Sequence, residues 1–148
     1  MKIIAEVFKL PSGSPIPQFY GLRDDGSIDR AVTDTLLDLI SESRPEELQK
    51  LDALLTLAQS GSYRPPNAEL PDWSANDKNI WLTAPRANIG VIVVSNENIP
   101  ELASGDGQPK QFSISEAKGA IHHWLQFLQK LSSSGAGNLI GQRFEASV

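Results

Sequence analysis

From residue 112 to residue 131 the chain reads FSISEAKGAIHHWLQFLQKL, and this stretch decides the fold class. Ser113 and Glu116 have the spacing of a capping box, which predicts that a helix begins here. The residues that follow place apolar side chains three or four positions apart, as a helix with a broad buried face requires. These residues are Ile114, Ala117, Ala120, Ile121, Trp124, Leu125, Leu128 and Leu131.

Two further helices are predicted between residues 28 and 60. The first has the apolar set Val32, Leu36, Leu39 and Ile40, with Ser27 as its expected N-cap. The second begins at Ser43, where Glu46 completes a capping box and Pro45 occupies the first turn. Its apolar set is Leu48, Leu51, Leu55 and Ala58. We therefore expect a short-linked helical hairpin.

Strands are predicted on both sides of this hairpin. Residues 2–10, 79–84, 89–95 and 110–114 are short and rich in β-branched or aromatic side chains, and the second and third should form an antiparallel hairpin joined by 85–88. Residues 11–17 contain three prolines, which favours an extended loop or a sheet edge over a central strand. Residues 62–78 and 96–109 are predicted to be loops and turns, the latter with a short helical piece near its start, and 138–148 is either an edge strand or frayed.

These elements predict an α+β fold in one domain, residues 1–148. A small, mostly antiparallel sheet of about four or five strands should pack against the three main helices. The acidic hairpin spans residues 28–60, the strand hairpin with the short strand and third helix spans 79–131, and residues 132–148 form a Gly/Ser link and tail. A chain of 148 residues is long enough to bury one self-sufficient core.

Composition excludes several classes of protein. The chain has no cysteine, which rules out a disulfide framework, a thiolate nucleophile, an iron–sulfur cluster and a sulfur-bound zinc site. Glu6 interrupts the first apolar run too early for a signal peptide, and the longest apolar block, 89–94, is too short to cross a membrane. We expect a cytoplasmic protein without a membrane-spanning segment.

The net charge is −5, and nine of the 18 acidic residues fall between residues 24 and 52. An acidic mean field repels phosphate backbones, so nucleic acid is not expected as a partner. A concentrated negative segment can steer a basic protein towards its binding surface. It can equally be a solvated helical face that keeps the protein dispersed.

The sequence lacks the common catalytic and cofactor motifs. It has no phosphate-binding loop, no dinucleotide fingerprint, no nucleophile elbow and no zinc-protease motif. His122 and His123 are the only histidines and, being adjacent on a helix, point about 100° apart, so one metal cannot easily take both. Asp24, Asp25 and Gly26 read as a turn and not as a calcium loop. We therefore predict no catalytic residue, no metal and no cofactor.

The candidate binding residues come from the acidic hairpin and the loop after it. Asp34 and Asp38 lie one turn apart on the predicted outer side of the first helix, where carboxylates could bind arginine or lysine side chains of a partner. Tyr63 and Trp73 supply aromatic surface in the following loop, where Trp73 is either an anchor of the loop or an interface hot spot. The full candidate set is Asp34, Asp38, Glu42, Glu46, Tyr63 and Trp73.

This arrangement resembles the immunity proteins of contact-dependent inhibition and related bacterial toxin systems. The resemblance covers residues 80–131, where the stretch from Phe112 to Glu116 runs into a helix that carries Trp124. It implies a protein that binds one toxin domain and blocks its active site or substrate surface. Because many such toxins have basic clefts, the implied partner is a basic toxin domain.

Two other functions remain open at this stage. An adaptor or chaperone-type binding module would have the same composition but would bind an apolar or helical segment with weak salt dependence. An unrecognised small enzyme would rely on His123 and a carboxylate as its acid–base pair.

Overall fold

The computed structural model describes residues 1–67, 69–75, 78–86, 89–95 and 110–148. It contains two four-stranded antiparallel sheets. Sheet A has the order β3-β2-β1-β8, with β1 at Lys2–Lys9, β2 at Pro15–Leu22, β3 at Ile28–Asp29 and β8 at Arg143–Ser147. Sheet B has the order β4-β5-β6-β7, with β4 at Trp73–Ala75, β5 at Lys78–Arg86, β6 at Ile89–Ser95 and β7 at Lys110–Ser113. The α+β class with antiparallel strands is confirmed, and the strands are shared between two sheets.

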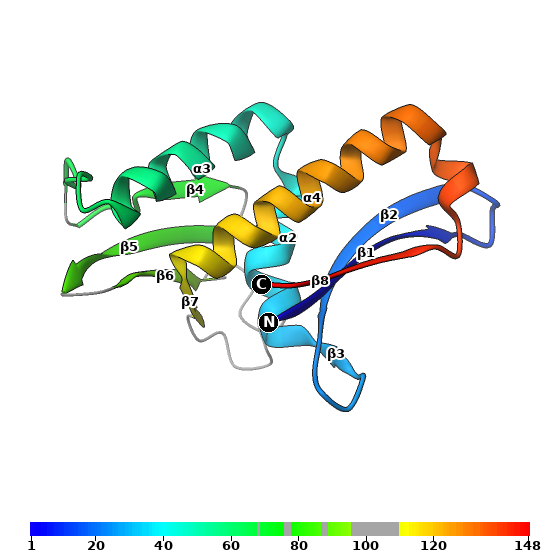
Figure 1. Ribbon diagram of the computed structural model, residues 1–148, viewed down its shortest axis with the longest axis horizontal. Helices are drawn as coiled ribbons and strands as arrows, with labels where there is room; N and C mark the ends of the chain where they lie inside the picture. The colour runs from blue at the N-terminus through cyan, green and yellow to red at the C-terminus, as the bar shows by residue number, and fades with distance from the viewer. Residues whose placement is uncertain (68, 76–77, 87–88, 96–109) are drawn as a thin grey trace.

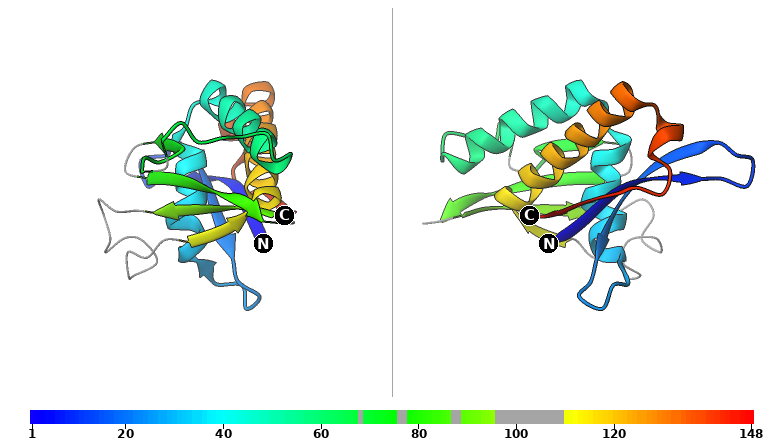
Figure 2. Two further views of the ribbon diagram at one scale, coloured as in Figure 1. Left: turned by 90° about the vertical axis from the view of Figure 1, so that its left-hand side faces the viewer. Right: turned by 45° about the vertical axis from the view of Figure 1, so that its right-hand side comes forward.

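Three helical regions connect and cover these sheets. The first is α1 (Arg30–Val32), the π-helical turn η1 (Thr33–Leu37) and α2 (Asp38–Glu42), which run as one segment between the two sheets (Figure 1). The second is α3 (Pro45–Gln59), and the third is α4 (Ile114–Ser134), followed by the short 3-10 helix η2 (Ala136–Leu139). Figure 2 shows α3 and α4 side by side on the same side of the sheets.

Helix caps follow the sequence rules, though only α4 begins where the pattern predicts. The hydroxyl of Ser113 accepts from the backbone N–H of Glu116, and the carboxylate of Glu116 accepts from that of Ser113. The first helix is capped by Asp29 and not by Ser27, because the Ser27 amide and hydroxyl donate to Asp25 in the preceding turn. The α3 cap is one residue later than predicted.

At that α3 cap, the carboxylate of Glu47 accepts from the backbone N–H of Arg44 at 3.0 Å. Ser43 is buried, and its hydroxyl instead donates to the carbonyl of Leu39 at 2.6 Å. Serine can satisfy a helix end in either direction, and here its burial against α2 selects the C-terminal role. The predicted capping box at Ser43 and Glu46 was therefore wrong by one position.

The core joins both sheets through α4. Trp124 stacks on Phe19 of sheet A at a centroid distance of 5.0 Å, and the first turns of α4 bury Ile114 and Ala117 in the same apolar cluster as Ile80 of sheet B. The predicted α3 stripe is buried as expected: Leu48, Leu51, Leu55 and Ala58. The predicted α4 face is buried at Ile114, Ala117, Ala120, Ile121 and Trp124, and the pattern missed Phe127.

Residues 15–17 are the first three residues of β2, at the edge of sheet A, which confirms the edge alternative and not the loop. Pro17 lies opposite Val7, and Gly21 lies opposite Ile3 and, on the other side, Asp29 of β3. The backbone N–H of Gly21 points away from β1 and donates to the hydroxyl of Thr33. Pro15 and Pro17 lie an even number of residues from Gly21, so the N–H groups that proline lacks are ones that would also point away from β1. The strand β3 reaches only Gly21 and Leu22, so these prolines lie at an edge.

The remaining predictions have mixed outcomes. The hairpin of β5 and β6 and the short strand β7 are confirmed. The tail forms edge strand β8, which pairs with β1. The predicted loop 62–78 contains the short strand β4, which the sequence pattern did not indicate. Residues 87–88 of the predicted turn, and the turn, helical piece and loop predicted at 96–109, lie outside the described residues.

Candidate partner-binding surface

The structure separates the four predicted acidic residues into two inner and two outer ones. The side chain of Asp34 is 14% exposed and lies 3.1 Å from the Nε of Arg30, and Asp38 is half-buried. Glu42 and Glu46 are exposed, Glu42 at the end of α2 and Glu46 in the first turn of α3. The prediction that Asp34 and Asp38 form the exposed acidic face was wrong, because this helical segment packs between the two sheets, against β2 and β6.

Glu42 and Trp73 meet in a recess where α2 turns into α3. We call this hollow the corner recess; it has a volume of about 250 Å³. Its lining residues are Glu42, Ser43, Glu47, Trp73, Ser74 and Ala75. Pockets for drug-sized ligands usually measure about 300–1,000 Å³. The corner recess is thus of a size to take one protruding side chain.

The lining of the corner recess is anionic. Glu42 and Glu47 are its ionisable residues. Hydrogen bonds from the backbone and side chain of Arg44 lower the pKa of Glu47, so this carboxylate stays ionised at neutral pH. Lys78 is almost fully buried and lies 3.8 Å from the carboxylate of Glu42, whose side chain is still 47% exposed. Two carboxylates beside an indole are suited to contact a guanidinium or ammonium group of a partner in addition to Arg44 and Lys78.

A half-buried aspartate, Asp72, holds Tyr63 next to Trp73. The phenol of Tyr63 donates to Asp72 at 2.6 Å, and the backbone N–H of Leu82 donates to the other oxygen of Asp72 at 2.7 Å. Burial, followed by the hydrogen bond to Asp72, raises the pKa of Tyr63 to about 12. Both aromatic residues pack against the apolar core. Trp73 is therefore a loop anchor that also lines the corner recess.

A histidine–aspartate pair lies between α3 and α4, and the sequence analysis missed it. The Nε2 of His122 lies 3.0 Å from Asp52, and the Nζ of Lys118 lies 2.9 Å from the same oxygen. Lys118 also donates to the hydroxyl of Thr56 at 2.6 Å. With the imidazole half-exposed and the carboxylate shared with lysine, the arrangement is that of a surface ion pair linking two helices. No local pattern indicates it, because Asp52 and His122 are far apart in the sequence.

His123 takes a different role from the acid–base one considered above. Its Nε2 lies 2.9 Å from the backbone carbonyl of Phe144, and its ring lies beside Phe19. Within the described part of the chain, its polar contact is this carbonyl and not a carboxylate. The imidazole therefore connects α4 to β8.

Sheet A contains a buried acid that the sequence analysis also missed. Glu6 is almost fully buried, accepts a short hydrogen bond from the phenol of Tyr20, and lies 3.4 Å from the Nε of Arg143. Burial, followed by the hydrogen bond to Glu6, raises the pKa of Tyr20 to about 12. The only signal in the sequence is a charged residue within an apolar strand, a pattern that more often marks an exposed position.

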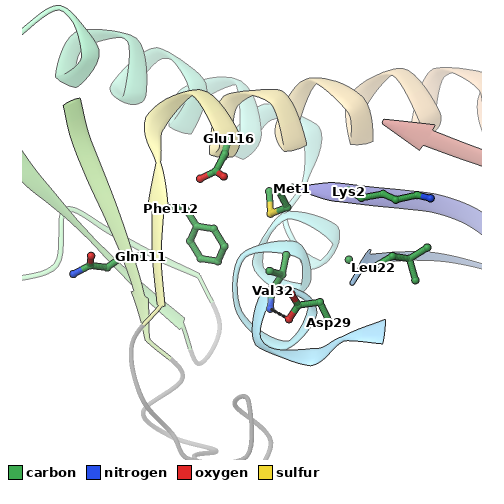
Figure 3. Close-up of a pocket in the computed structure, with 9 residues that line it drawn as sticks. Met1, Lys2, Leu22, Asp29, Val32, Gln111, Phe112 and Glu116 are labelled. Atoms are coloured by element: carbon green, nitrogen blue, oxygen red, sulfur yellow. Dashed lines mark hydrogen bonds between the residues drawn. The ribbon is translucent and has the colours of Figure 1, made fainter. Parts of the chain in front are cut away.

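A second hollow of about 230 Å³ lies between the two sheets, where Met1 and Val32 approach Phe112 (Figure 3). Its two carboxylates already serve as helix caps. Asp29 accepts from the backbone of Val32, and Glu116 accepts from the backbone of Ser113. The corner recess has two carboxylates beside the indole of Trp73, and this combination makes it the stronger candidate for binding a cationic side chain.

Comparison with protein-family models, with curated proteins and with solved structures gave no match. The resemblance to immunity proteins stays a prediction. Across the described residues, no three His, Asp or Glu side chains gather closely enough to hold a metal ion, and no helix is long and apolar enough to span a bilayer.

Proposed function

We propose that this protein binds a basic protein partner and acts as an immunity protein that neutralises a toxin domain. The observation that carries the proposal is the corner recess, where the carboxylates of Glu42 and Glu47 lie beside Trp73. A cationic side chain of the partner would enter this hollow and contact the indole face. Glu46, exposed next to the recess, would add to the local negative potential.

The proposed surface differs from the one expected from the sequence. Glu42, Glu46 and Trp73 stay in it, while Asp34 and Asp38 are half-buried and do not line the recess. Tyr63 supports Trp73 through Asp72. The electrostatic part of the interaction is therefore concentrated at the start of α3.

The direct test is co-purification from the native host, followed by binding measurements on the purified pair. We expect association to slow markedly between about 50 mM and about 500 mM salt, because screening shortens the reach of exposed charges. Salt-independent binding would instead support the adaptor function, with an apolar contact. Turnover of a substrate that disappears in His123→Ala would support the enzyme.

Two matched variants locate the surface. Glu46→Lys reverses an exposed charge beside the corner recess and should weaken binding about tenfold or more, mainly through slower association. Asp24→Lys makes the same change of net charge in an exposed turn and should leave binding nearly unchanged. Equal effects of the two variants would mean that only the total charge matters and would remove the corner recess from the interface. Glu42→Gln and Trp73→Phe then test the lining itself.

A further inference from the structure

Strand β8 leaves one side of sheet A open. Met1 and Val148 exchange backbone hydrogen bonds of 2.7 Å and 2.9 Å. In an antiparallel pair every second residue is bonded in this way, so the backbone N–H and C=O groups of Ala146 and Phe144 also point towards β1. The backbone N–H and C=O groups of Arg143, Glu145 and Ser147 consequently point away from the sheet. All three residues are exposed, and among the described strands none pairs with this outer edge.

The opposite edge of sheet A is protected. There β3 covers the end of β2, and Pro15 and Pro17 remove two of the three outward donors that precede it, leaving the one of Phe19. Proline and short edge strands are two of the devices by which proteins prevent strand addition. Strand β8 contains no proline, and no described strand covers it. An additional strand would therefore pair with sheet A along β8.

The open edge carries a charge of each sign. Arg143 and Glu145 are two residues apart and so project from the same face of the sheet. The Nε of Arg143 lies 3.4 Å from the carboxylate of Glu6, and the Nζ of Lys2 lies 3.0 Å from the carboxylate of Glu145. The two side chains nevertheless remain 61% and 53% exposed. They are thus held in position and still available to a neighbouring strand.

We propose that a second copy of this chain pairs with sheet A along β8, antiparallel and centred on Phe144. In this register Arg143 lies opposite Glu145 of the second copy, and the two residues exchange backbone hydrogen bonds. The two-fold axis repeats the arrangement, so both charge pairs are satisfied by the same surface. A register centred on Glu145 would instead place like charges opposite each other, which is unfavourable.

The other face of the strand supports the same register. Phe144 packs on Phe127 with ring centroids 5.5 Å apart, and the ammonium group of Lys130 lies 4.7 Å from its ring. Across the two-fold axis the two Phe144 side chains become direct cross-strand neighbours, and aromatic pairs of this kind stabilise a sheet. The edge therefore complements itself in charge on one face and in apolar surface on the other.

The expected dimer is weak and depends on concentration. Stable interfaces usually bury about 1,200–2,000 Å² in total, and this register pairs only residues 143–145 of β8 with the same residues of the second copy, which contributes less. The proposed interface uses β8, whereas the corner recess is lined by residues of α2, α3 and β4 and by Ser43 between the two helices, so the two surfaces share no residue. Partner binding and self-association can therefore be tested separately.

Sedimentation equilibrium across a wide range of protein concentration tests the proposal. The unaltered protein should shift from monomer to dimer as concentration rises. Arg143→Glu and Glu145→Arg should each weaken self-association about tenfold or more, because each puts like charges opposite each other at both positions. An equimolar mixture of the two variants should dimerise again, since each copy then faces its complement.

Recovery in the mixture distinguishes the proposal from a simple loss of stability. Thermal unfolding of each variant checks the fold, because Arg143→Glu brings a second acid near Glu6. Glu145→Pro provides an independent variant, since it removes an outward N–H that β1 does not use. It should abolish dimerisation, and the charge-matched pair Lys50→Glu and Glu69→Lys, both exposed and distant in sequence, should not. A protein that stays monomeric at high concentration, or variants that fail to recover on mixing, would overturn the proposal.

Discussion

The chain has two tyrosines, one in sheet A and one in the loop that leads to sheet B, and each phenol donates to a carboxylate in a different setting. In sheet A, Tyr20 and Glu6 are both buried and connect neighbouring strands, with Arg143 from the other end of the chain as third member. Next to sheet B, Tyr63 is half-buried and fixes the loop before β4 through its hydrogen bond to Asp72. The comparison teaches that one chemical pair can serve as a long-range clamp or as a local loop anchor, depending on burial.

Helix α4 joins the two halves, so its disruption should affect both. Trp124→Ala removes a buried indole that stacks on Phe19 and packs against Phe127 at a tilt, and we expect a loss of about 3–5 kcal/mol in the free energy of unfolding. Urea unfolding followed by circular dichroism, with hydrogen exchange of both sheets, measures this effect. Leu57→Ala at an exposed position should change stability by about 0.5 kcal/mol or less. Loss of protection in only one sheet would contradict the linking role of α4.

Alkaline pH should weaken the tyrosine pairs, and the one in sheet A more strongly. A phenol with a pKa near 10 in the unfolded chain and about 12 in the folded protein is protonated in both states below pH 10. As pH rises from 10 to 12 the unfolded state loses the proton first, so stability falls. For the buried Tyr20 the loss approaches roughly 3 kcal/mol, because each pKa unit is worth about 1.4 kcal/mol. Denaturant midpoints measured from pH 9 to pH 12 in the wild type and in Tyr20→Phe test this.

Tyr20→Phe separates the two clamps at neutral pH. The change removes a hydrogen bond to a buried carboxylate, and we expect a cost of about 2 kcal/mol with Arg143 still beside Glu6. Hydrogen exchange should increase in β1, β2 and β8 more than in sheet B. A uniform change across both sheets would show that the pair is not specific to sheet A.

Tyr63→Phe should have the smallest effect of the series. Its phenol is half-buried, and Asp72 keeps the hydrogen bond from the backbone of Leu82, so we expect a loss of about 1 kcal/mol. The change should also loosen Trp73, which tryptophan fluorescence would report. A cost equal to that of Tyr20→Phe would contradict the distinction drawn between clamp and anchor.

Local sequence patterns predicted the elements well and the polar contacts poorly. The capping box at Ser113, the α3 stripe from Leu48 to Ala58 and the hairpin of β5 and β6 all rest on spacing within a few residues, and all are confirmed. The predicted exposure of Asp34 was wrong, because the helical segment that carries it packs between the two sheets. The pairs of Glu6 with Arg143 and Asp52 with His122 join distant segments, so no local spacing encodes them.

The candidate site was predicted only in part for the same reason. Glu42 and Trp73 were chosen for charge and aromatic surface, and the fold brings them into one recess. Glu47 joins them because the α3 cap falls one residue later than its pattern predicts. Whether a carboxylate is exposed or shielded depends on what packs behind it, which is a property of the assembled layers.

The sequence by itself determined the helices, most strands, the acidic segment and the absence of thiol chemistry, because these depend on residue identity and short-range spacing. The tertiary structure decided that the strands form two sheets, that Glu6 is buried and that β8 is the edge strand of sheet A. Those outcomes depend on contacts between residues far apart in the chain. Their free energies arise from burial and pairing, which exist only once the segments have come together.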